Sequence, residues 1–180
     1  MKIELNRDWT EFLCLLISRR VRFLVIGGHA VAGHGEPRLT EDLDVFVDRA
    51  PENAKRLRDA LVDFGFGTAA PQPRELSRPH KVFMLGRKPW RIDILTSIDG
   101  VSFKEAWASR VAAQFVATPL YVIGREMLIK NKRASARDKD VHDVALLEAH
   151  APQRKPKAAK TPRAKPKVRV PPRRKRRASK

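Results

Sequence analysis

Four short apolar segments of the chain are typical of β-strands. They are "VRFLVIGG" at 21–28, "LDVFVD" at 43–48, "HKVFMLG" at 80–86 and "WRIDILT" at 90–96. The last two are separated only by "RKP", so the pattern predicts a β-hairpin. The first ends in a glycine pair, which predicts a tight turn directly after that strand.

Other segments carry apolar side chains at helical spacing. They predict helices at 8–20, 29–35, 50–66, 121–134 and 138–150, partial helix at 102–115 and a loop at 71–79. Cys14, the single cysteine, lies in the apolar run "EFLCLLI" and is expected to be buried in the core. The order of elements predicts an α/β (α+β) domain in which helices flank a small mixed β-sheet.

The positive charge of the chain is concentrated at its end. The 180 residues carry a net charge of +18, but 14 Lys and Arg and no acidic residue lie in 151–180. A segment of Pro, Ala, Lys and Arg has too little apolar surface to offset the entropy of ordering. We therefore expect a folded domain at 1–150 and a disordered tail at 151–180 that binds polyanions, above all nucleic acid.

Two further patterns bear on location. No apolar run approaches the roughly 18 residues that a membrane helix needs. The N-terminal "MKIELNRDWTEF" is charged throughout and lacks the apolar core of a secretory signal. The sequence therefore predicts a cytoplasmic protein without a membrane partner.

Gly27 and Gly28 stand where a strand gives way to a predicted helix. Glycine backbones allow close approach of a ligand, and a helix start favours an anion, so this turn is a candidate phosphate site. The segment matches neither the dinucleotide-binding G-x-G-x-x-G pattern nor the P-loop. A tight turn without any ligand is the alternative that the glycines alone leave open.

Three aspartates are candidate metal ligands. Asp42 and Asp44 are two residues apart and share one face of a strand, and Asp93 interrupts a second apolar strand between Ile92 and Ile94. Like charges so close repel one another, and a divalent cation such as Mg²⁺ or Mn²⁺ would remove that penalty. If the two strands are neighbours, the three carboxylates can hold two metal ions about 4 Å apart. The alternative is the solvent-facing side of an edge strand.

The stretch "VIGGHAVAGHGEPRLTEDLDVFV" resembles the signature of nucleotidyltransferases of the DNA polymerase beta superfamily. That signature is an apolar strand, Gly-Gly or Gly-Ser, about a dozen residues and Asp-x-Asp, and the spacing from Gly28 to Asp42 fits it. Arg38 and Thr40 resemble the "R-x-T-x-D-x-D" version found in the abortive-infection toxin-like branch and its bacterial relatives. His29 departs from the pattern, because other branches often carry a small or hydroxyl residue there.

The resemblance implies a nucleotidyltransferase fold over about residues 10–149 and a nucleoside triphosphate (NTP) as substrate. It places the triphosphate on Gly27 and Gly28, and the metal ions on Asp42, Asp44 and Asp93, which would be the catalytic residues. Asp93 falls where the family has its third carboxylate and would accept the proton of the acceptor hydroxyl.

The segment "LIKNKRASARDKDVHDVALLEA" carries a second candidate site. Basic residues at a helix start oppose the helix dipole, and a bound anion would repair this. The segment resembles the "K…R-x-K-D-x-x-D" motif of the toxin-like branch, which places nucleotide-binding roles on Lys132, Arg137, Lys139 and Asp140, with Asp143 completing the motif. Lys130 is an alternative to Lys132, and a solvated charged helix is the alternative without any ligand.

These patterns together predict a Mg²⁺-dependent enzyme that moves a nucleoside monophosphate (NMP) from an NTP to a hydroxyl. The acceptor is open among RNA, with a tRNA end as the first expectation, a protein side chain and a small molecule such as an antibiotic. A toxin masked by an antitoxin partner is a further possibility. The rival hypothesis is a non-catalytic nucleic-acid-binding protein that acts through its basic tail.

Overall fold

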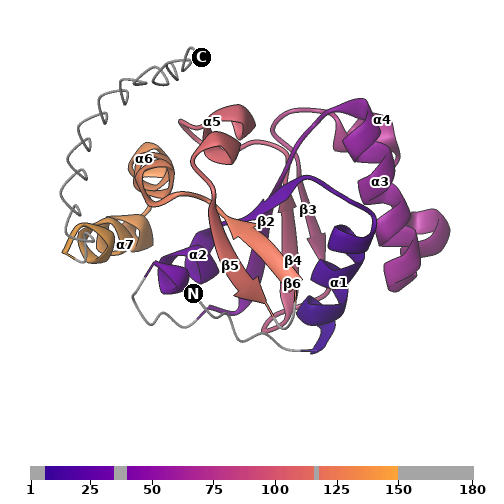
Figure 1. The fold of residues 1–180 in the computed structure, drawn as a ribbon, viewed down its shortest axis with the longest axis horizontal. Coiled ribbons are helices and arrows are strands. Elements are labelled where there is room, and N and C mark those ends of the chain that lie inside the picture. Colours follow the sequence, from indigo (N-terminus) through magenta and orange to yellow (C-terminus); the bar gives the residue numbers. More distant parts are fainter. Residues whose placement is uncertain (1–6, 35–39, 116–117, 150–180) are drawn as a thin grey trace, which may run out of the picture.

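The computed structural model describes residues 7–34, 40–115 and 118–149. A central sheet has helices on both sides, as Figure 1 shows, so the predicted α/β architecture with a small mixed sheet is confirmed. The elements in chain order are α1 (Arg7–Ser18), β1 (Phe23–Val25), α2 (Gly27–Gly33), β2 (Asp42–Val47), α3 (Pro51–Leu61), the π-helical η1 (Val62–Phe66), the 3₁₀ turn η2 (Gly67–Ala69), α4 (Pro73–Leu76), β3 (Val82–Leu85), β4 (Arg91–Leu95), α5 (Phe103–Ala108), β5 (Val111–Phe115), β6 (Thr118–Val122), α6 (Arg125–Ser135) and α7 (Asp138–Ala149).

The six strands lie in the order β3-β4-β2-β1-β6-β5. β3 and β4 form the expected antiparallel hairpin. β4 runs parallel to β2, and β2 runs antiparallel to β1. At the far side β1 pairs in parallel with β6, and β6 pairs with β5 in a second hairpin. The glycine turn and the two aspartate strands therefore meet in the middle of the sheet.

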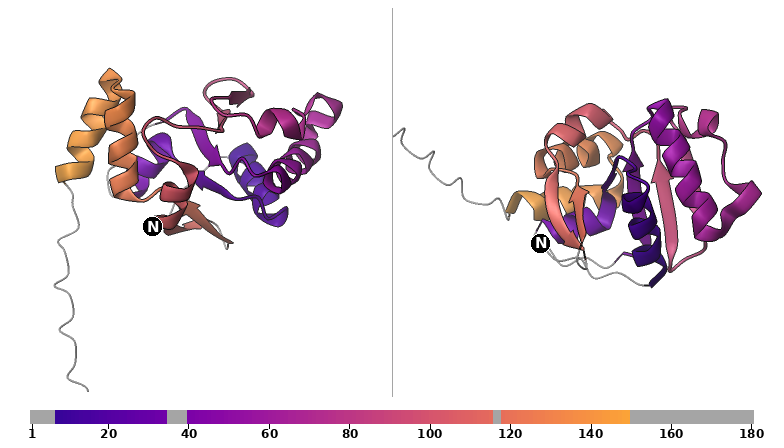
Figure 2. Two further views of the ribbon diagram at one scale, coloured as in Figure 1. Left: turned by 90° about the horizontal axis from the view of Figure 1, so that it is seen from above. Right: turned by 45° about the vertical axis from the view of Figure 1, so that its right-hand side comes forward.

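The sheet separates two hydrophobic cores. The core on one side packs under α1, α3 and α4, and it takes Leu43, Val45 and Val47 from β2. The other core packs under α2, α5, α6 and α7, and it takes Phe46 from β2. Figures 1 and 2 show the two groups of helices on opposite sides of the sheet. Because side chains alternate along a strand, Asp42 and Asp44 lie on the side of Phe46, which we call the α2/α6 face.

The predictions missed β5 and β6. The segment 102–115 was expected to be partly helical, but its helix ends at Ala108 and β5 follows. The predicted helix at 121–134 begins only at Arg125, because Tyr121 and Val122 belong to β6 and Gly124 is the N-cap of the helix. β6 is a strand because it pairs with β5 in a hairpin and lies beside β1, where Val25 is opposite Val122. The β1 contact joins segments far apart in the sequence, which local spacing does not report.

Two local predictions were also wrong. The expected loop at 71–79 contains α4, whose first turn starts at Pro73 and is closed by reciprocal hydrogen bonds between Gln72 and Glu75. Cys14 is exposed instead of buried. The buried side of α1 is formed by Trp9, Phe12, Leu13 and Leu16, and at about 100° per residue position 14 points away from it.

The basic tail at 151–180 lies outside the described residues, so its predicted disorder and the domain division stay predictions. Among the helices that the structure does describe, none combines the length and the apolar character that a membrane span requires.

Candidate functional site

A cavity of about 410 Å³ opens on the α2/α6 face. It is lined by both aspartate strands, the start of α2, and the facing helices α6 and α7. Nine of the eleven residues predicted for the site line it: Gly27, Gly28, Asp42, Asp44, Asp93, Lys132, Arg137, Lys139 and Asp140. The structure therefore brings together two motifs that lie far apart in the sequence. Of the other two, Thr40 contacts Asp42, and Arg38 lies outside the described residues.

The parallel register of β2 and β4 places the three carboxylates side by side. Asp44 lies directly opposite Asp93, and Asp42 lies opposite Arg91. Residues opposite one another point to the same face of a sheet, so all four side chains share the α2/α6 face. Thr40 donates a hydrogen bond to Asp42 through its hydroxyl (2.9 Å, Oγ1 to Oδ1) and so orients this carboxylate.

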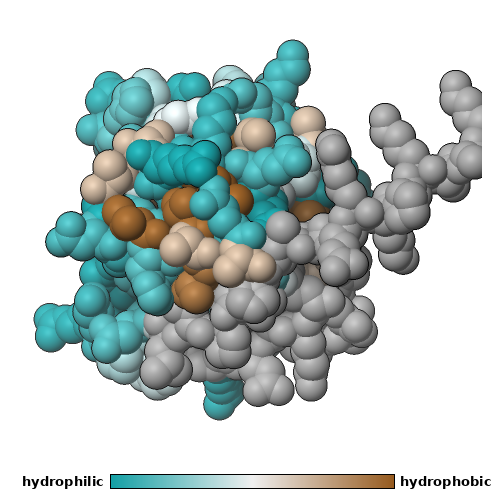
Figure 3. All heavy atoms as spheres, turned by 90° about the vertical axis from the view of Figure 1, so that its left-hand side faces the viewer, coloured by the Kyte–Doolittle hydropathy of each residue, from teal (hydrophilic) through white to brown (hydrophobic). Residues whose placement is uncertain are grey.

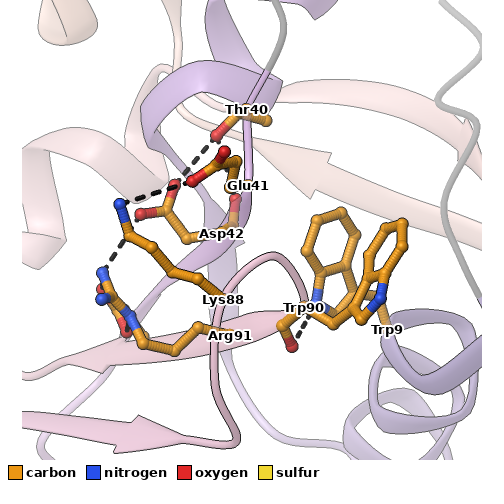
Figure 4. A network of polar contacts seen from close by, with 8 residues as sticks. Trp9, Thr40, Glu41, Asp42, Lys88, Trp90 and Arg91 are labelled. Atoms are coloured by element: carbon orange, nitrogen blue, oxygen red, sulfur yellow. Dashed lines mark hydrogen bonds and ion pairs between the residues drawn. The ribbon is translucent and has the colours of Figure 1, made fainter.

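Arg91 is a site residue that the sequence reasoning missed. Its Nε and Nη2 donate to the two oxygens of Asp93, both at 2.7 Å, and Nη2 also donates to Asp42 at 3.1 Å. The hydrogen bonds that Arg91 donates to Asp93, together with the negative charges of Asp93, Asp42 and Asp44, raise the pKa of Arg91. Figure 4 shows Arg91 and Lys88 beside Asp42, Glu41 and Thr40. The sequence contained one signal for the role of Arg91: it stands two residues before Asp93, and residues i and i+2 share a strand face.

Asp44 is the carboxylate whose charge is least well compensated. Burial raises its pKa from the ordinary 3.8 to about 6, and the negative charges of Asp42 and Asp93 contribute to this rise. Lys139 and Lys132 act in the opposite direction, so both cations are close enough to influence Asp44. The site therefore carries negative charge that its own cations compensate only in part.

Gly27 makes room for Asp44. It adopts a left-handed backbone conformation, with φ +64°, and a Cβ built on it would come within 1.9 Å of Asp44 Oδ2. The backbone amide of Ile26, the preceding residue, donates to the Asp44 carbonyl at 3.0 Å. The glycine is thus needed for both its conformation and its lack of a side chain.

Replacing Gly27 with alanine is expected to destabilise the fold and displace the Asp44 carboxylate. Left-handed strain alone costs roughly 1–2 kcal/mol, and the contact with Asp44 adds to it. Urea denaturation and divalent-metal titration would measure both effects. Gly65→Ala is the matched control, because Gly65 also has positive φ (+108°) but a Cβ added there would meet nothing within 4 Å. Equal stability losses and unchanged metal affinity in both variants would contradict the packing role of Gly27.

Lys132 holds a buried ion cluster between α6 and α7. Its Nζ lies 2.9 Å from Asp140 Oδ1 and 2.6 Å from Asp143 Oδ2, and both carboxylates are fully buried. The other oxygen of Asp140 accepts from Ser135 Oγ at 2.6 Å and from Arg137 Nε at 2.8 Å. Burial raises the pKa of Asp140, but the combined hydrogen bonds from its three partners bring it well below the ordinary range.

The predicted cations differ in how far they are exposed to a ligand in the cavity. Lys132 is 5% exposed and directs its ammonium to two carboxylates. The Arg137 side chain is 63% exposed and Lys139 is exposed, so these two present charge to the cavity. α7 begins at Asp138, with Asp138 and Asp140 in its first turn, so acidic residues accompany the basic ones at this helix start. Figure 3 shows a mostly hydrophilic surface around a small hydrophobic patch at this end of the molecule.

The two histidines near the glycine turn have separate environments. His29 is buried with its ring 5.1 Å from that of Trp9, and burial lowers its pKa to about 4 although Asp42 raises it. The Nε2 atom of His34 lies 2.8 Å from the Ile123 carbonyl.

The donor chemistry of the site fits a divalent cation. Asp42, Asp44 and Asp93 supply carboxylate oxygens on one face, and burial together with the charges of Asp42 and Asp93 raises the pKa of Asp44, a penalty that a bound cation would relieve. Within the described ranges no three His, Cys, Asp or Glu side chains form a ready-made metal site. The guanidinium of Arg91 already bonds to Asp42 and Asp93, so a metal ion would have to displace it at least in part.

The comparisons with known proteins bear on the fold. No protein-family model matches the chain, and no match is found among curated protein sequences. Among solved structures, the chain is similar to the lincosamide antibiotic adenylyltransferase LnuA in its lincomycin-bound form. The TM-score is 0.50 at 13% sequence identity, and the match covers 82% of this chain and 98% of that one.

A second similar structure is an antigenic nucleotidyltransferase-like protein from Paracoccidioides brasiliensis. Its TM-score is 0.48 at 14% identity, over 82% of this chain and 78% of that chain. At these identities a likeness concerns the fold alone, and the assignment of the fold rests on the first match, which has the higher TM-score. The architecture of the chain is therefore the nucleotidyltransferase fold.

Proposed function

We propose that the protein transfers an NMP from an NTP to a hydroxyl acceptor and releases pyrophosphate. The observation that carries this proposal is the composition of the cavity. Three carboxylates lie on one face of adjacent strands, and the exposed cations Arg137, just before α7, and Lys139, in its first turn, line the same cavity. Negative and positive groups so arranged suit a substrate that brings both a metal ion and a polyphosphate.

The cations of the α6–α7 side would hold the triphosphate. Arg137 and Lys139 are the exposed donors, while Lys132 contributes charge from within its cluster and fixes the helix pair. The backbone of Gly27 and Gly28 would contact phosphate from the opposite wall of the cavity. In this arrangement the α-phosphorus of the NTP would lie close to Asp44 and Asp93, which are opposite one another on adjacent strands.

In the transfer step, the acceptor oxygen forms a bond to the α-phosphorus and the bond to the bridging β-phosphate oxygen breaks. Pyrophosphate leaves with that electron pair, and Asp93 takes the proton of the hydroxyl. A divalent ion held by Asp42, Asp44 and Asp93 would supply charge neutralisation at the reacting phosphate. Arg91 orients Asp93 through its two-pronged contact until substrate and metal bind.

The choice of acceptor within this proposal is open to one experiment. The toxin role and an antitoxin partner are supported only by the resemblance of the Arg38–Thr40 and Lys132–Asp143 segments to the toxin-like branch. The lincosamide in the name of LnuA belongs to that protein. For this chain, a small-molecule acceptor is the alternative that the test must separate from RNA.

The test incubates the full chain with each α-labelled NTP, Mg²⁺ or Mn²⁺, and one of three acceptors: total cellular RNA, a panel of hydroxyl-bearing antibiotics, or no addition. We expect label to move to one acceptor class, with release of pyrophosphate. Asp93→Asn should bind the NTP but transfer nothing. NTP binding without transfer to any acceptor by the wild type would favour the non-catalytic alternative, and absence of NTP binding would overturn the proposal.

A further inference from the structure

The β3–β4 hairpin presents an exposed basic surface beside Asp93. No acidic residue occurs between Glu75 and Asp93, whereas this stretch contains several cations. The hairpin surface, as we define it, consists of exposed residues of this stretch on β3 and its two flanks: Arg78, His80, Lys81, Val82, Met84, Arg87 and Lys88.

The register of the hairpin directs part of this surface toward the site. Met84 lies opposite Asp93, and Val82 lies opposite Leu95, so both side chains share the α2/α6 face with the carboxylates. Met84 is 65% exposed and Val82 is 53% exposed. Within the described residues β3 is the last strand of the sheet, so nothing in the sheet order lies beyond it. Val82 and Met84 therefore form an exposed apolar surface beside Asp93, which we call the apolar shelf.

The two sides of Asp93 differ in chemistry. Toward β2 lie Asp44 and then the glycine turn, and Arg137 and Lys139 line the same cavity from the start of α7. That side suits the triphosphate. The side toward β3 carries the exposed Val82 and Met84, and an acceptor that approaches over them has to displace Arg91 from one oxygen of the largely buried Asp93.

Cations mark both ends of the shelf. His80 lies at one end and lines the cavity, with Arg78 and Lys81 beside it in the sequence. Arg87 and Lys88 lie at the other end, in the turn of the hairpin. Lys88 pairs with Glu41 at 3.4 Å, but both side chains are more than half exposed, so this pair holds the lysine weakly.

We propose that the hairpin surface docks a single-stranded nucleic acid whose terminal hydroxyl reaches Asp93, a proposal that rests on the transfer activity proposed above. From Val82 to Leu85 the strand extends about 10 Å at roughly 3.3 Å per residue, and with its two flanks it is long enough for two or more nucleotides. Phosphates contact the cations at the two ends, and a sugar or base packs on Val82 and Met84. A small uncharged acceptor would need the shelf but not the cations.

The test crosslinks the full chain to a single-stranded RNA of about 12 nucleotides, a length within known single-strand site sizes, that carries 4-thiouridine at its 3′ end. The reaction contains EDTA and no NTP, and a DNA oligonucleotide of the same sequence forms a second arm. We expect the 3′ end to crosslink to peptides from residues 80–91. Crosslinks confined to residues 151–180 would overturn the proposal and favour a small-molecule acceptor at the hairpin.

A pair of double variants tests the charges. Arg87→Gln with Lys88→Gln should lower the hairpin crosslink yield severalfold and reduce the log–log salt slope of RNA binding by about 1.4, at about 0.7 per lost phosphate contact. Lys55→Gln with Arg56→Gln removes the same charges from exposed positions of α3, on the other side of the sheet, and should change neither value. Equal effects of both pairs would show only a net-charge effect and would contradict a docking surface.

Failure of this proposal is distinguishable from failure of the proposed function. The crosslinking needs neither metal nor NTP, so its outcome does not depend on catalysis. NTP binding measured separately on the Arg87→Gln, Lys88→Gln variant should equal that of the wild type. Transfer to an antibiotic without any hairpin crosslink would support the proposed transferase activity and contradict a nucleic-acid acceptor.

Discussion

Replacing Asp44 with asparagine is expected to remove the proposed nucleotide transfer and, at neutral pH, to raise the free energy of unfolding. Asp44 lies at the centre of the carboxylate row, so the activity should fall by about a thousandfold or more, because the lost charge stabilisation is worth several kcal/mol. The fold should gain stability because the asparagine has the same shape but no buried charge.

The sign follows from the pKa of Asp44. Folding raises it from 3.8 to about 6, so the folded protein binds this proton more tightly than the unfolded chain does. Below pH 3.8 both states are protonated and the residue costs nothing. As the pH rises through 6, the wild type loses up to about 3 kcal/mol that Asp44→Asn keeps. The two proteins should therefore be equally stable near pH 4 or below and differ most at neutral pH.

Urea denaturation at the two pH values, with label transfer measured in parallel, checks this expectation. Asp59→Asn is the control, since Asp59 is an exposed residue of α3 and its replacement should stay within about 0.5 kcal/mol of wild type. If Asp44→Asn were less stable than wild type at neutral pH, the carboxylate would have a structural role. Retained transfer would remove Asp44 from the catalytic residues.

Replacing Lys132 with methionine should be the most destabilising single substitution among the predicted site residues. It would leave Asp140 and Asp143 buried without the ammonium that lies between them. Breaking a buried pair in this way typically costs about 3–5 kcal/mol. Chemical denaturation should show a loss of about this size.

Lys130→Met provides the matched control on the same helix. Lys130 pairs with Glu105 at 3.1 Å, but both side chains are about half exposed, so its loss should cost less than about 1 kcal/mol. Adding Asp140→Asn and Asp143→Asn to Lys132→Met should recover part of the stability, because the buried charges are then gone. A Lys132→Met protein of normal stability with weakened NTP binding would instead make Lys132 a direct phosphate ligand.

The sequence predicted much of the framework of the site. Alternation along the strand predicted that Asp42 and Asp44 share one face, and the structure confirms this, with Leu43, Val45 and Val47 in the core on the other face. The same reasoning set Asp93 apart from Ile92 and Ile94. These inferences work because the direction of a side chain on a strand depends only on its position in a short segment.

What the side chains contact was decided by the tertiary structure. Arg91 bonds to Asp42 only because β4 lies parallel to β2 in this register, and a shift by one residue would turn Arg91 to the opposite face. Lys132 resembles a free phosphate ligand in the sequence, but the packing of α6 on α7 surrounds it with two carboxylates.

The same distinction explains the missed strands. β6 pairs with β5 in a hairpin that the spacing of apolar residues did not reveal, and this hairpin joins the sheet through β1, whose residues lie far away along the chain. The sequence by itself therefore determined which chemical groups are present and which face each one occupies. Only the tertiary structure decided which charges neutralise one another and which stay available to a ligand, because partners and burial depend on contacts between remote segments.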